Sequence, residues 1–301
     1  MEESKLVQNF RVACGTKRIY RCANTDNLGV ICEGPVTITI RENTPEFIIL
    51  NRSQLILDLR SPSERDENLA QSWMCNAPGG KIEIINYDRE RSDTSQLILS
   101  SERCALRVDL LSPTRLFQYL EKNWINGPLE KAQYSFSYTF DSKKLHEMRM
   151  EILNNKGLSG LYEAMIETSG PEFFACLQAI TVHLESKTGD IIIHCVQGKD
   201  RTGILIMLCQ AMLGVNDDEI INDYHCSDQM MKGSAASESL TGSKGKLNRI
   251  IFSGAPKEAM AKTLDMIRTK HVSVNGYLDS IGFDTNWRNR FITASSLRNK
   301  L

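Results

Sequence analysis

A cysteine and an arginine separated by five residues mark the part of this chain best suited to chemistry. Cys195 and Arg201 lie in the stretch His-Cys-Val-Gln-Gly-Lys-Asp-Arg-Thr-Gly, residues 194–203. The apolar run Ile191–Ile193 precedes this stretch, and the apolar segment Ile204–Cys209 follows it. This order predicts a buried strand, a tight polar turn and a buried helix. Backbone N–H groups converge at such a helix N-terminus, and the helix dipole adds positive potential, so the turn suits a tetrahedral anion.

The side chains of the turn fit attack on a phosphate ester. The helix N-terminus and Arg201 should favour the thiolate of Cys195, which can attack phosphorus and hold a covalent phosphoryl group. The planar guanidinium of Arg201 matches two phosphate oxygens. Gly198 lets the backbone turn tightly, and Thr202 could bond to the sulfur or cap the helix. The backbone amides of residues 196–201, from Val196 and Gln197 onward, would hold the non-bridging oxygens.

Two other interpretations of the turn are weaker. Nucleotide-binding P-loops end in Gly-Lys-Ser/Thr, whose hydroxyl binds magnesium, but here Gly198-Lys199 is followed by Asp200. Cys195 could also be an ordinary buried cysteine, because cysteines are often buried. That alternative does not explain why the arginine, the glycines and the strand–helix frame are all in register with it. We therefore predict that Cys195 is a nucleophile.

The stretch resembles the signature of the cysteine-dependent protein tyrosine and dual-specificity phosphatases, His-Cys-x-x-Gly-Lys-x-Arg-Thr-Gly. Its Lys-Asp-Arg form is similar to the branch that contains the mycobacterial secreted tyrosine phosphatase B. Shorter matches to that branch lie along nearly the whole chain: Asn9-Phe10-Arg11, Tyr20-Arg21, Asp58-Leu59-Arg60 with Glu64, Gly160-Leu161-Tyr162, Asp223-Tyr224 and Tyr277-Leu278. The resemblance implies an α/β fold whose central, mostly parallel sheet is flanked by helices. It also implies hydrolysis of phosphate monoesters, with phosphotyrosine in proteins as the first substrate class, through a phosphocysteine.

The residue that would protonate the leaving oxygen is the open point of this mechanism. A general acid typically contributes ~10² to 10⁴ in rate. The family resemblance points to Asp200 inside the loop, with Asp88 as the second choice and Asp58 as the third. His194 would help to fix the loop and the ionisation of the cysteine.

Lys199 keeps a second substrate class open. A lysine at this position resembles phosphoinositide-active relatives, because an ammonium would attract a second phosphate on an inositol ring. Lys199 could instead merely balance nearby carboxylates. A third possibility, from a different class, is a phosphate-binding interaction module without turnover. The presence of both Cys195 and Arg201 argues against that module.

A second strand is expected to place more charged residues beside the turn. The apolar run Leu55–Leu57 predicts a buried strand that ends at Asp58. Sites in open α/β sheets form outside the carboxyl ends of the strands. If this strand runs parallel beside the one that leads into the turn, Asp58 and Arg60 could bind substrate. The alternative is a structural ion pair between this segment and its own Glu64.

The hydrophobic pattern also predicts strands and loops elsewhere in the chain. Alternating or apolar runs predict strands at Val36–Ile40, Phe47–Leu50 and Lys81–Asn86. Residues 9–22 are expected to form an irregular N-terminal arm, and residues 60–80 a mobile insertion. The arginines of the arm that could reach the phosphate, or equally lie in solvent, are Arg11, Arg18 and Arg21.

The second half of the chain is predicted to be mainly helical. Residues 112–165 could form a lid insertion over the site, within a single domain that spans residues 1–301. The Ser-, Gly-, Ala- and Lys-rich residues 232–246 are expected to be a flexible loop. Further helices are predicted over residues 172–184, from Asn216 toward Cys226, and over residues 256–270 and 274–281.

Composition limits the partners and the compartment. The 36 Lys and Arg residues nearly balance the 37 Asp and Glu residues. Nucleic acids and anionic membranes usually select basic surfaces, so neither is expected as the main partner. The longest apolar run, residues 204–209, is far too short to span a bilayer, so stable membrane insertion is not expected. The oligomeric state is not indicated.

The cysteines and histidines point to a reducing compartment and no metal. The nine cysteines form an odd set without a Cys-x-x-Cys pair, which is typical of proteins whose thiols stay reduced. The start of the chain shows no signal-peptide pattern. We therefore expect a cytoplasmic location, with the nucleus as the second choice. The five histidines show no metal-ligand spacing, so we predict no metal or other cofactor.

Overall fold

The computed structural model describes residues 7–15, 18–25, 49, 51–65, 80–90, 95–186, 189–230 and 247–296. The strand predicted at Val36–Ile40 and the loop predicted at residues 232–246 lie outside these ranges. So do most of the strand predicted at Phe47–Leu50 and residues 66–79 of the predicted insertion.

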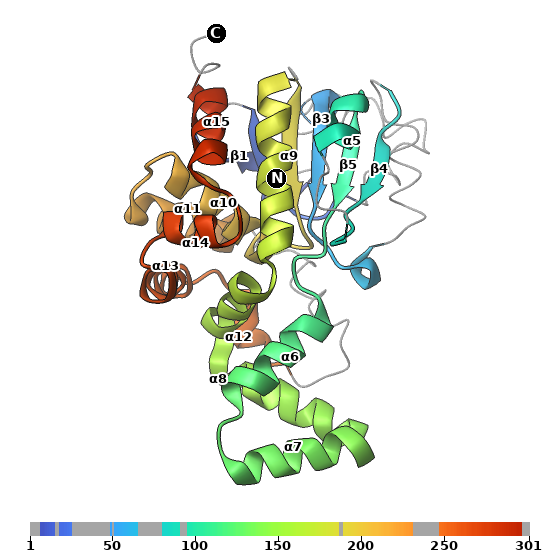
Figure 1. The fold of residues 1–301 in the computed structure, drawn as a ribbon, viewed down its shortest axis with the longest axis vertical. Helices are drawn as coiled ribbons and strands as arrows, with labels where there is room; N and C mark the ends of the chain where they lie inside the picture. Colours follow the sequence, from blue (N-terminus) through green and yellow to red (C-terminus); the bar gives the residue numbers. More distant parts are fainter. Residues whose placement is uncertain are drawn as a thin grey trace, which may run out of the picture.

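A twisted sheet forms the centre of the described chain (Figure 1). It has six strands in the order β1-β2-β6-β3-β5-β4. Every neighbouring pair is parallel except β1 with β2. The strands are β1 Arg11–Val12, β2 Ile19–Cys22, β3 Ser53–Asp58, β4 Glu83–Asn86, β5 Cys104–Arg107 and β6 Asp190–His194. This sheet confirms the predicted α/β fold with a mostly parallel sheet.

The strand that leads into the loop of residues 195–200 lies at the centre of the sheet. All five residues of β6 are buried, as expected for a parallel strand covered on both faces. On one side β6 pairs with β3, where Leu57 is opposite Ile193 and Asp58 is opposite His194. The strand predicted at Leu55–Leu57 is confirmed, and it runs parallel beside β6, which is the condition under which Asp58 and Arg60 come to the same rim.

The N-terminal arm differs from its prediction. Residues 9–22 contain two short strands, because β2 pairs in parallel with β6 and β1 folds back antiparallel on β2. Their polar residues carry no strand pattern of their own, so the hydrogen bonds offered by β6 determine the conformation. Arg18, before β2, bonds to the carbonyl of Gly189 at the amino end of β6. It therefore lies at the opposite end of the strand from the turn.

Helices cover the sheet and extend beyond it. They are α5 Ser95–Ser100, α6 Pro113–Trp124, α7 Pro128–Phe140, α8 Ser142–Thr168, α9 Gly170–Ser186, α10 Asp200–Met212, α11 Asp217–Met230, α12 Arg249–Ser253, α13 Lys257–His271, α14 Val274–Ser280 and α15 Thr285–Ser296. A single 3-10 turn, η1 Pro62–Glu64, follows β3. The helices predicted over residues 172–184, 256–270 and 274–281 are confirmed. So is the one from Asn216, whose side chain accepts a bond from the Glu219 amide at 3.0 Å.

The main core lies between one face of the sheet and the helices. Leu55, Leu57, Ile191 and Ile193 point into it from the strands, and α9 and α10 supply the largest share of the helical side. A smaller cluster on the opposite face includes Ile56 and Ile192, together with side chains of the N-terminal segment. No helix in the described ranges has the length and apolar character needed to cross a bilayer.

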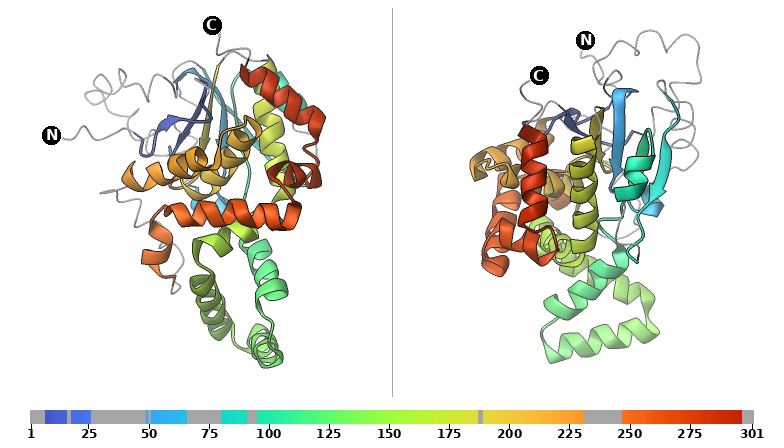
Figure 2. Two further views of the ribbon diagram at one scale, coloured as in Figure 1. Left: turned by 90° about the vertical axis from the view of Figure 1, so that its left-hand side faces the viewer. Right: turned by 45° about the horizontal axis from the view of Figure 1, so that its top comes forward.

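Three helices project from the end of the molecule at which the strands finish (Figures 1 and 2). They are α6, α7 and the first part of α8, and we call them the helical insertion. Leu116 and Leu120, one turn apart on α6, pack with Tyr134 of α7 in a separate cluster. Within α8, Gly157 has φ 61° and ψ −160°, so the helix is broken there. The predicted helical character of residues 112–165 is confirmed, and their role as a lid stays a prediction.

Candidate active site

The turn after β6 has the predicted frame. The strand ends at His194, Cys195 is 1% exposed, and α10 begins at Asp200. Gly198 has φ +63°, and a Cβ added there would lie 2.1 Å from the carbonyl oxygen of Cys22. The turn therefore needs glycine for two reasons, its left-handed backbone and its close approach to β2.

The carbonyl groups of the turn are held on its outer side. Asn9 donates its side-chain amide to the carbonyl oxygens of Gln197 at 3.0 Å and Gly198 at 2.9 Å. The backbone N–H of Asn24 donates to the carbonyl of Val196 at 2.9 Å. Arg21 adds a bond of 2.8 Å to the carbonyl of Gly198. In a planar trans peptide the N–H points opposite to the C=O. The N–H groups that follow these carbonyls are therefore turned toward the inside of the loop.

Two arginines of the N-terminal segment share one carboxylate on α11. Asp223 on α11 pairs with Arg11 at 3.0 Å and with Arg21 at 2.7 Å. Both guanidinium groups thus bond to protein acceptors behind the loop. Their position supports the shape of the turn and does not bring them to its inner side.

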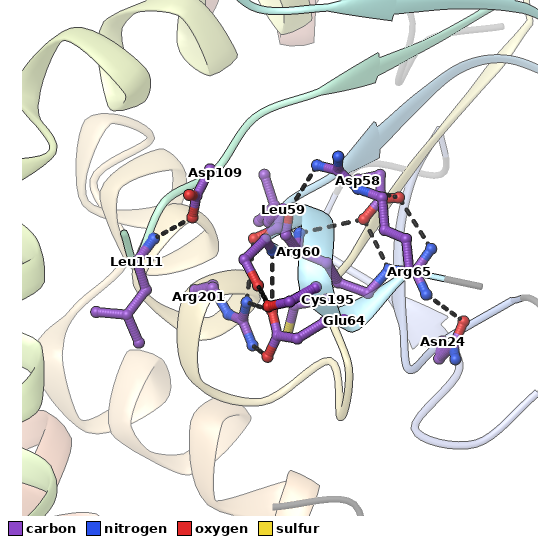
Figure 3. Close-up of polar contacts among 12 residues, drawn as sticks. Asn24, Asp58, Leu59, Arg60, Glu64, Arg65, Asp109, Leu111, Cys195 and Arg201 are labelled. Atoms are coloured by element: carbon purple, nitrogen blue, oxygen red, sulfur yellow. Dashed lines mark hydrogen bonds and ion pairs between the residues drawn. The ribbon is translucent and has the colours of Figure 1, made fainter. Parts of the chain in front are cut away.

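Arg201 is fixed by Glu64, which comes from the 3-10 turn after β3 (Figure 3). Both terminal nitrogens of the guanidinium donate to the carboxylate, one of them at 2.8 Å. Glu64 is held in turn by the backbone N–H and the hydroxyl of Ser61. Burial alone would raise the pKa of Glu64, but the bonds from Arg201 outweigh burial and lower it. Likewise, burial would lower the pKa of Arg201, but the bonds to Glu64 raise it above its usual value.

This partnership was not predicted. The sequence suggested that Glu64 could pair within its own segment, whereas it reaches across to α10. Figure 3 shows Cys195, Arg201 and Glu64 gathered in one place. With one edge of its guanidinium on Glu64, Arg201 is oriented before any anion binds.

Asp58 and Arg60 form a closed, buried pair. Asp58 accepts bonds of 2.9 Å from Nε and from a terminal nitrogen of Arg60, and both side chains are fully buried. Arg60 also donates to Asn24 at 2.9 Å. Burial alone would raise the pKa of Asp58, but His194 and Arg60 hold it well below its usual range. The geometry is that of a structural ion pair beneath the rim.

Asp200 lies at the first turn of α10 with one carboxylate oxygen engaged. Its Oδ1 accepts a bond from the hydroxyl of Tyr162. The ammonium of Lys199 is 3.5 Å from the same oxygen. Lys199 is fully buried and donates to the carbonyls of Phe252 at 2.7 Å and Gly254 at 2.8 Å. The ammonium of Lys199 is thus engaged on α12 and the residue after it.

Two further predicted positions differ in their surroundings. The hydroxyl of Thr202 is buried and makes no hydrogen bond to the described residues, so it bonds to neither the sulfur nor the helix end. Asp88 is exposed after β4, three strands away from β6. At the usual strand spacing this corresponds to ~14 Å. His194 is buried beside Asp58.

Asp109 is a carboxylate that the sequence interpretation missed. It follows β5, the neighbour of β3, and Oδ1 accepts a bond from the Leu111 amide at 3.2 Å (Figure 3). No strand was predicted at Cys104–Arg107, so no site residue was expected at the end of that strand. The mostly apolar segment before Asp109 was the available signal in the sequence.

Metal ligation finds no support in the part of the chain that the structure describes. No group of three or more His, Cys, Asp or Glu side chains there could hold an ion.

Two comparisons match known proteins. A sequence model of the tyrosine phosphatase family matches residues 50–294, from just before β3 to near the end of α15. A tyrosine-protein phosphatase from Nostoc commune is 29% identical over 104 residues. That stretch covers 35% of this chain and 34% of the Nostoc protein, so the chain aligns with about a third of this relative.

Proposed function

This chain belongs to the tyrosine phosphatase family, and from that premise we propose that it hydrolyses phosphate monoesters through a phosphocysteine at Cys195. The observation that carries the proposal is the loop with its carbonyls held outward, around a buried cysteine and beside a guanidinium fixed by Glu64. Such preorganised donors stabilise the charge of a transferring phosphoryl group. The Lys-Asp-Arg form of the loop supports a place near the mycobacterial branch.

The reaction has two steps. The thiolate of Cys195 attacks phosphorus, the ester P–O bond breaks, and Asp200 gives its proton to the leaving oxygen. Water then attacks phosphorus, the P–S bond breaks, and the proton of the water passes to the carboxylate of Asp200. Arg201 and the amides of residues 196–201 hold the non-bridging oxygens through both steps. The thiolate and the protonated acid are regenerated.

The other predicted residues have supporting roles in this proposal. Asp58 and Arg60 hold the end of β3 in place, and we assign them no contact with substrate because both are fully buried. His194 lies against Asp58 and fixes the start of the loop. Once the sulfur of Cys195 carries a negative charge, the hydroxyl of Thr202 can donate a hydrogen bond to it.

We place phosphotyrosine in proteins first among the substrates. The phosphoinositide alternative depended on the ammonium of Lys199, which bonds to the carbonyls of Phe252 and Gly254. An ammonium so engaged has to break two bonds to reach a second phosphate. Phosphate release from phosphotyrosine peptides should therefore exceed release from soluble inositol phosphates. The reverse order would favour the inositol class.

Trapping of the phosphoenzyme tests the central step. Acid quenching of wild-type protein during turnover of ³²P-labelled p-nitrophenyl phosphate should leave label on the protein, and Cys195→Ser should leave none. A chromogenic substrate should also give a burst with wild type alone. Binding of phosphate without a burst would show a phosphate-binding module instead of an enzyme.

The acid is tested by leaving-group dependence. Asp200→Asn should slow phosphoenzyme formation from an alkyl phosphate about a hundredfold, and hardly slow that from p-nitrophenyl phosphate, which needs no acid. Asp109→Asn and Asp88→Asn are the competing variants, because both carboxylates follow strands that end at the same edge. If one of them shows this signature and Asp200→Asn does not, the acid is that residue.

The cellular setting remains the one that the sequence suggests. None of the seven cysteines in the described ranges forms a disulfide, which supports a reducing compartment. We propose the cytoplasm or the nucleus. A thiolate nucleophile also requires reducing conditions to stay active.

A further inference from the structure

Two buried tyrosines meet at the carboxylate of Asp200. Tyr162 on α8 donates its hydroxyl to Oδ1 of Asp200, and its oxygen lies 2.7 Å from the hydroxyl of Tyr224 on α11. Neither tyrosine is more than 1% exposed. The two rings meet edge to face at 6.1 Å. Three helices, α8, α10 and α11, therefore contribute one side chain each to this contact.

The direction of the hydrogen bonds follows from the number of protons. The hydroxyl of Tyr162 has one proton, and that proton is engaged on Asp200, whose ionised form can only accept. Tyr224 must therefore donate to Tyr162. Burial raises the pKa of both phenols well above the usual value, so both are donors at neutral pH. The chain of bonds runs from Tyr224 through Tyr162 to Asp200.

The two oxygens of Asp200 are not equivalent. Oδ1 carries the bond from Tyr162 and faces the ammonium of Lys199 at 3.5 Å. No hydrogen bond from the described residues reaches Oδ2, and the side chain keeps 16% of its surface exposed. A general acid needs this asymmetry, because one oxygen must be held while the other carries the proton to the substrate.

We propose that Tyr162 is a positioning residue for proton transfer by Asp200, and that Tyr224 acts through Tyr162. This inference rests on the proposed function and on Asp200 as its acid. When Asp200 is protonated, Oδ1 accepts from Tyr162 and the proton on Oδ2 is directed to the leaving oxygen. After the transfer the carboxylate keeps the same bond to Tyr162, and Oδ2 takes the proton of the attacking water.

The local packing explains how the tyrosines stay in place. Gly203 on α10 faces the ring of Tyr224, and an added Cβ would lie 3.2 Å from its Cδ2. A larger residue at position 203 would displace that ring. Tyr162 lies beyond the break at Gly157, in the part of α8 that packs into the main core. The pair is therefore anchored to the body that carries the loop.

Tyr162→Phe is the direct test, since it removes one hydroxyl and keeps the ring. It should lower the single-turnover rate of phosphoenzyme formation from an alkyl phosphate about tenfold, the usual effect of losing one hydrogen bond to a charged group. The rate from p-nitrophenyl phosphate and KM should change little. A residue that only supports the fold would affect both leaving groups alike.

Tyr277→Phe is the matched control. Tyr277 is also buried, but its hydroxyl donates to the carbonyl of Ile166 at 3.1 Å. Its loss should leave the ratio of the two rates unchanged. Thermal unfolding of each variant identifies a general loss of folding, which would lower both rates together and would count against the inference.

Tyr224→Phe distinguishes a relay from two independent contacts. It should shift the ratio in the same direction by a smaller factor, and the double variant should be no worse than Tyr162→Phe. Full additivity would overturn the action of Tyr224 through Tyr162. If Asp200→Asn shows the leaving-group signature and Tyr162→Phe does not, the inference fails and the proposed acid stands. If Asp200→Asn shows none, the assignment of the acid fails first.

Discussion

Arg201 shows how one ion pair can orient a buried guanidinium. Arg201 is 8% exposed and its guanidinium is paired edge-on with Glu64, whose side chain is 33% exposed. Removing Glu64 would leave the buried guanidinium without its carboxylate, which destabilises the fold. The pair therefore ties the orientation of Arg201 to the stability of the fold.

Replacing Arg201 with lysine tests the need for the planar fork. The ammonium of Arg201→Lys keeps the charge, but its three donors cannot replace the two bonds to Glu64 together with two bonds to phosphate oxygens. We expect kcat/KM for p-nitrophenyl phosphate to fall about a hundredfold or more. Arg268→Lys is the control, because Arg268 forms an exposed pair with Asp217, and its activity should match wild type. Equal activities of the two variants would contradict the role of the fork.

The relative positions of single residues were predictable where those residues are close neighbours in the sequence. Cys195, Asp200 and Arg201 lie within seven residues of one another, and the loop that joins them defines their geometry. Glu64 could not be assigned to Arg201 in this way, because 137 residues separate the two. The engagement of Lys199 on α12 depends on a segment more than fifty residues away, so the sequence left its role undecided.

At the scale of elements, alanine substitutions at two glycines distinguish the cost of backbone strain from the cost of a steric clash. Gly198 and Gly214 both have positive φ, but an added Cβ at Gly214 meets nothing within 4 Å, whereas at Gly198 it meets the Cys22 carbonyl. Gly214→Ala should cost about 1–2 kcal/mol of stability and leave kcat unchanged. Gly198→Ala should cost more and abolish phosphatase activity. Urea unfolding and turnover measure both, and equal losses would exclude the clash.

The break in α8 makes a second prediction at this scale. Gly157 has φ 61° and ψ −160°, a region that is essentially restricted to glycine, yet the nearest atom to an added Cβ is a methyl of Ile251 at 3.5 Å. Gly157→Ala should therefore lower the free energy of unfolding by about 1–3 kcal/mol through conformation alone. Urea unfolding checks this value. An unchanged midpoint would mean that the break is not maintained.

Elements were predictable where hydrophobic periodicity and turn chemistry agreed. The buried run before the turn, and the helices over 172–184 and 256–270, follow from such patterns. The strands β1 and β2 were missed because they are two and four residues long and rich in arginine. Their conformation depends on hydrogen bonds offered by β6, which a local pattern does not contain.

At the scale of the whole molecule, the sheet brings distant charges to one edge. Asp58 with Arg60 lies at the carboxyl end of β3, Asp109 follows β5, and the loop of residues 195–200 follows β6. The full strand order could not be predicted from the sequence, because strands that pair, such as β2 and β6, are more than 160 residues apart. Once the order is known, the position of each charged residue on the rim follows from the end of its strand.

Asp58→Asn should show how the whole fold depends on this buried charge. It leaves Arg60 and Arg65 without their carboxylate, and we expect a loss of about 3–5 kcal/mol at pH 7. The pKa of Asp58 is lower in the folded than in the unfolded state. Its contribution is therefore fully present above the unfolded pKa of about 3.9 and is lost as the pH falls through the folded pKa.

Urea unfolding as a function of pH measures this dependence. The difference between wild type and Asp58→Asn should be constant near neutrality and should narrow only below about pH 4. Asp217→Asn is the comparison, because Asp217 is paired with Arg268 at the surface and such pairs contribute little. A difference that vanished already at neutral pH would contradict the role given to Asp58.

The two hydrogen bonds from the side chain of Asn9 to the loop join residues that are 188 and 189 positions apart in the chain. During synthesis, the amide of Asn9 is made almost two hundred residues before its carbonyl partners, so the loop is not held until the N-terminal segment has met residues 197 and 198. A protein cleaved by a protease just after Asn9 would still contain Cys195 and Arg201. It would lose, with the released peptide, the two hydrogen bonds that hold these carbonyls on the outer side of the loop.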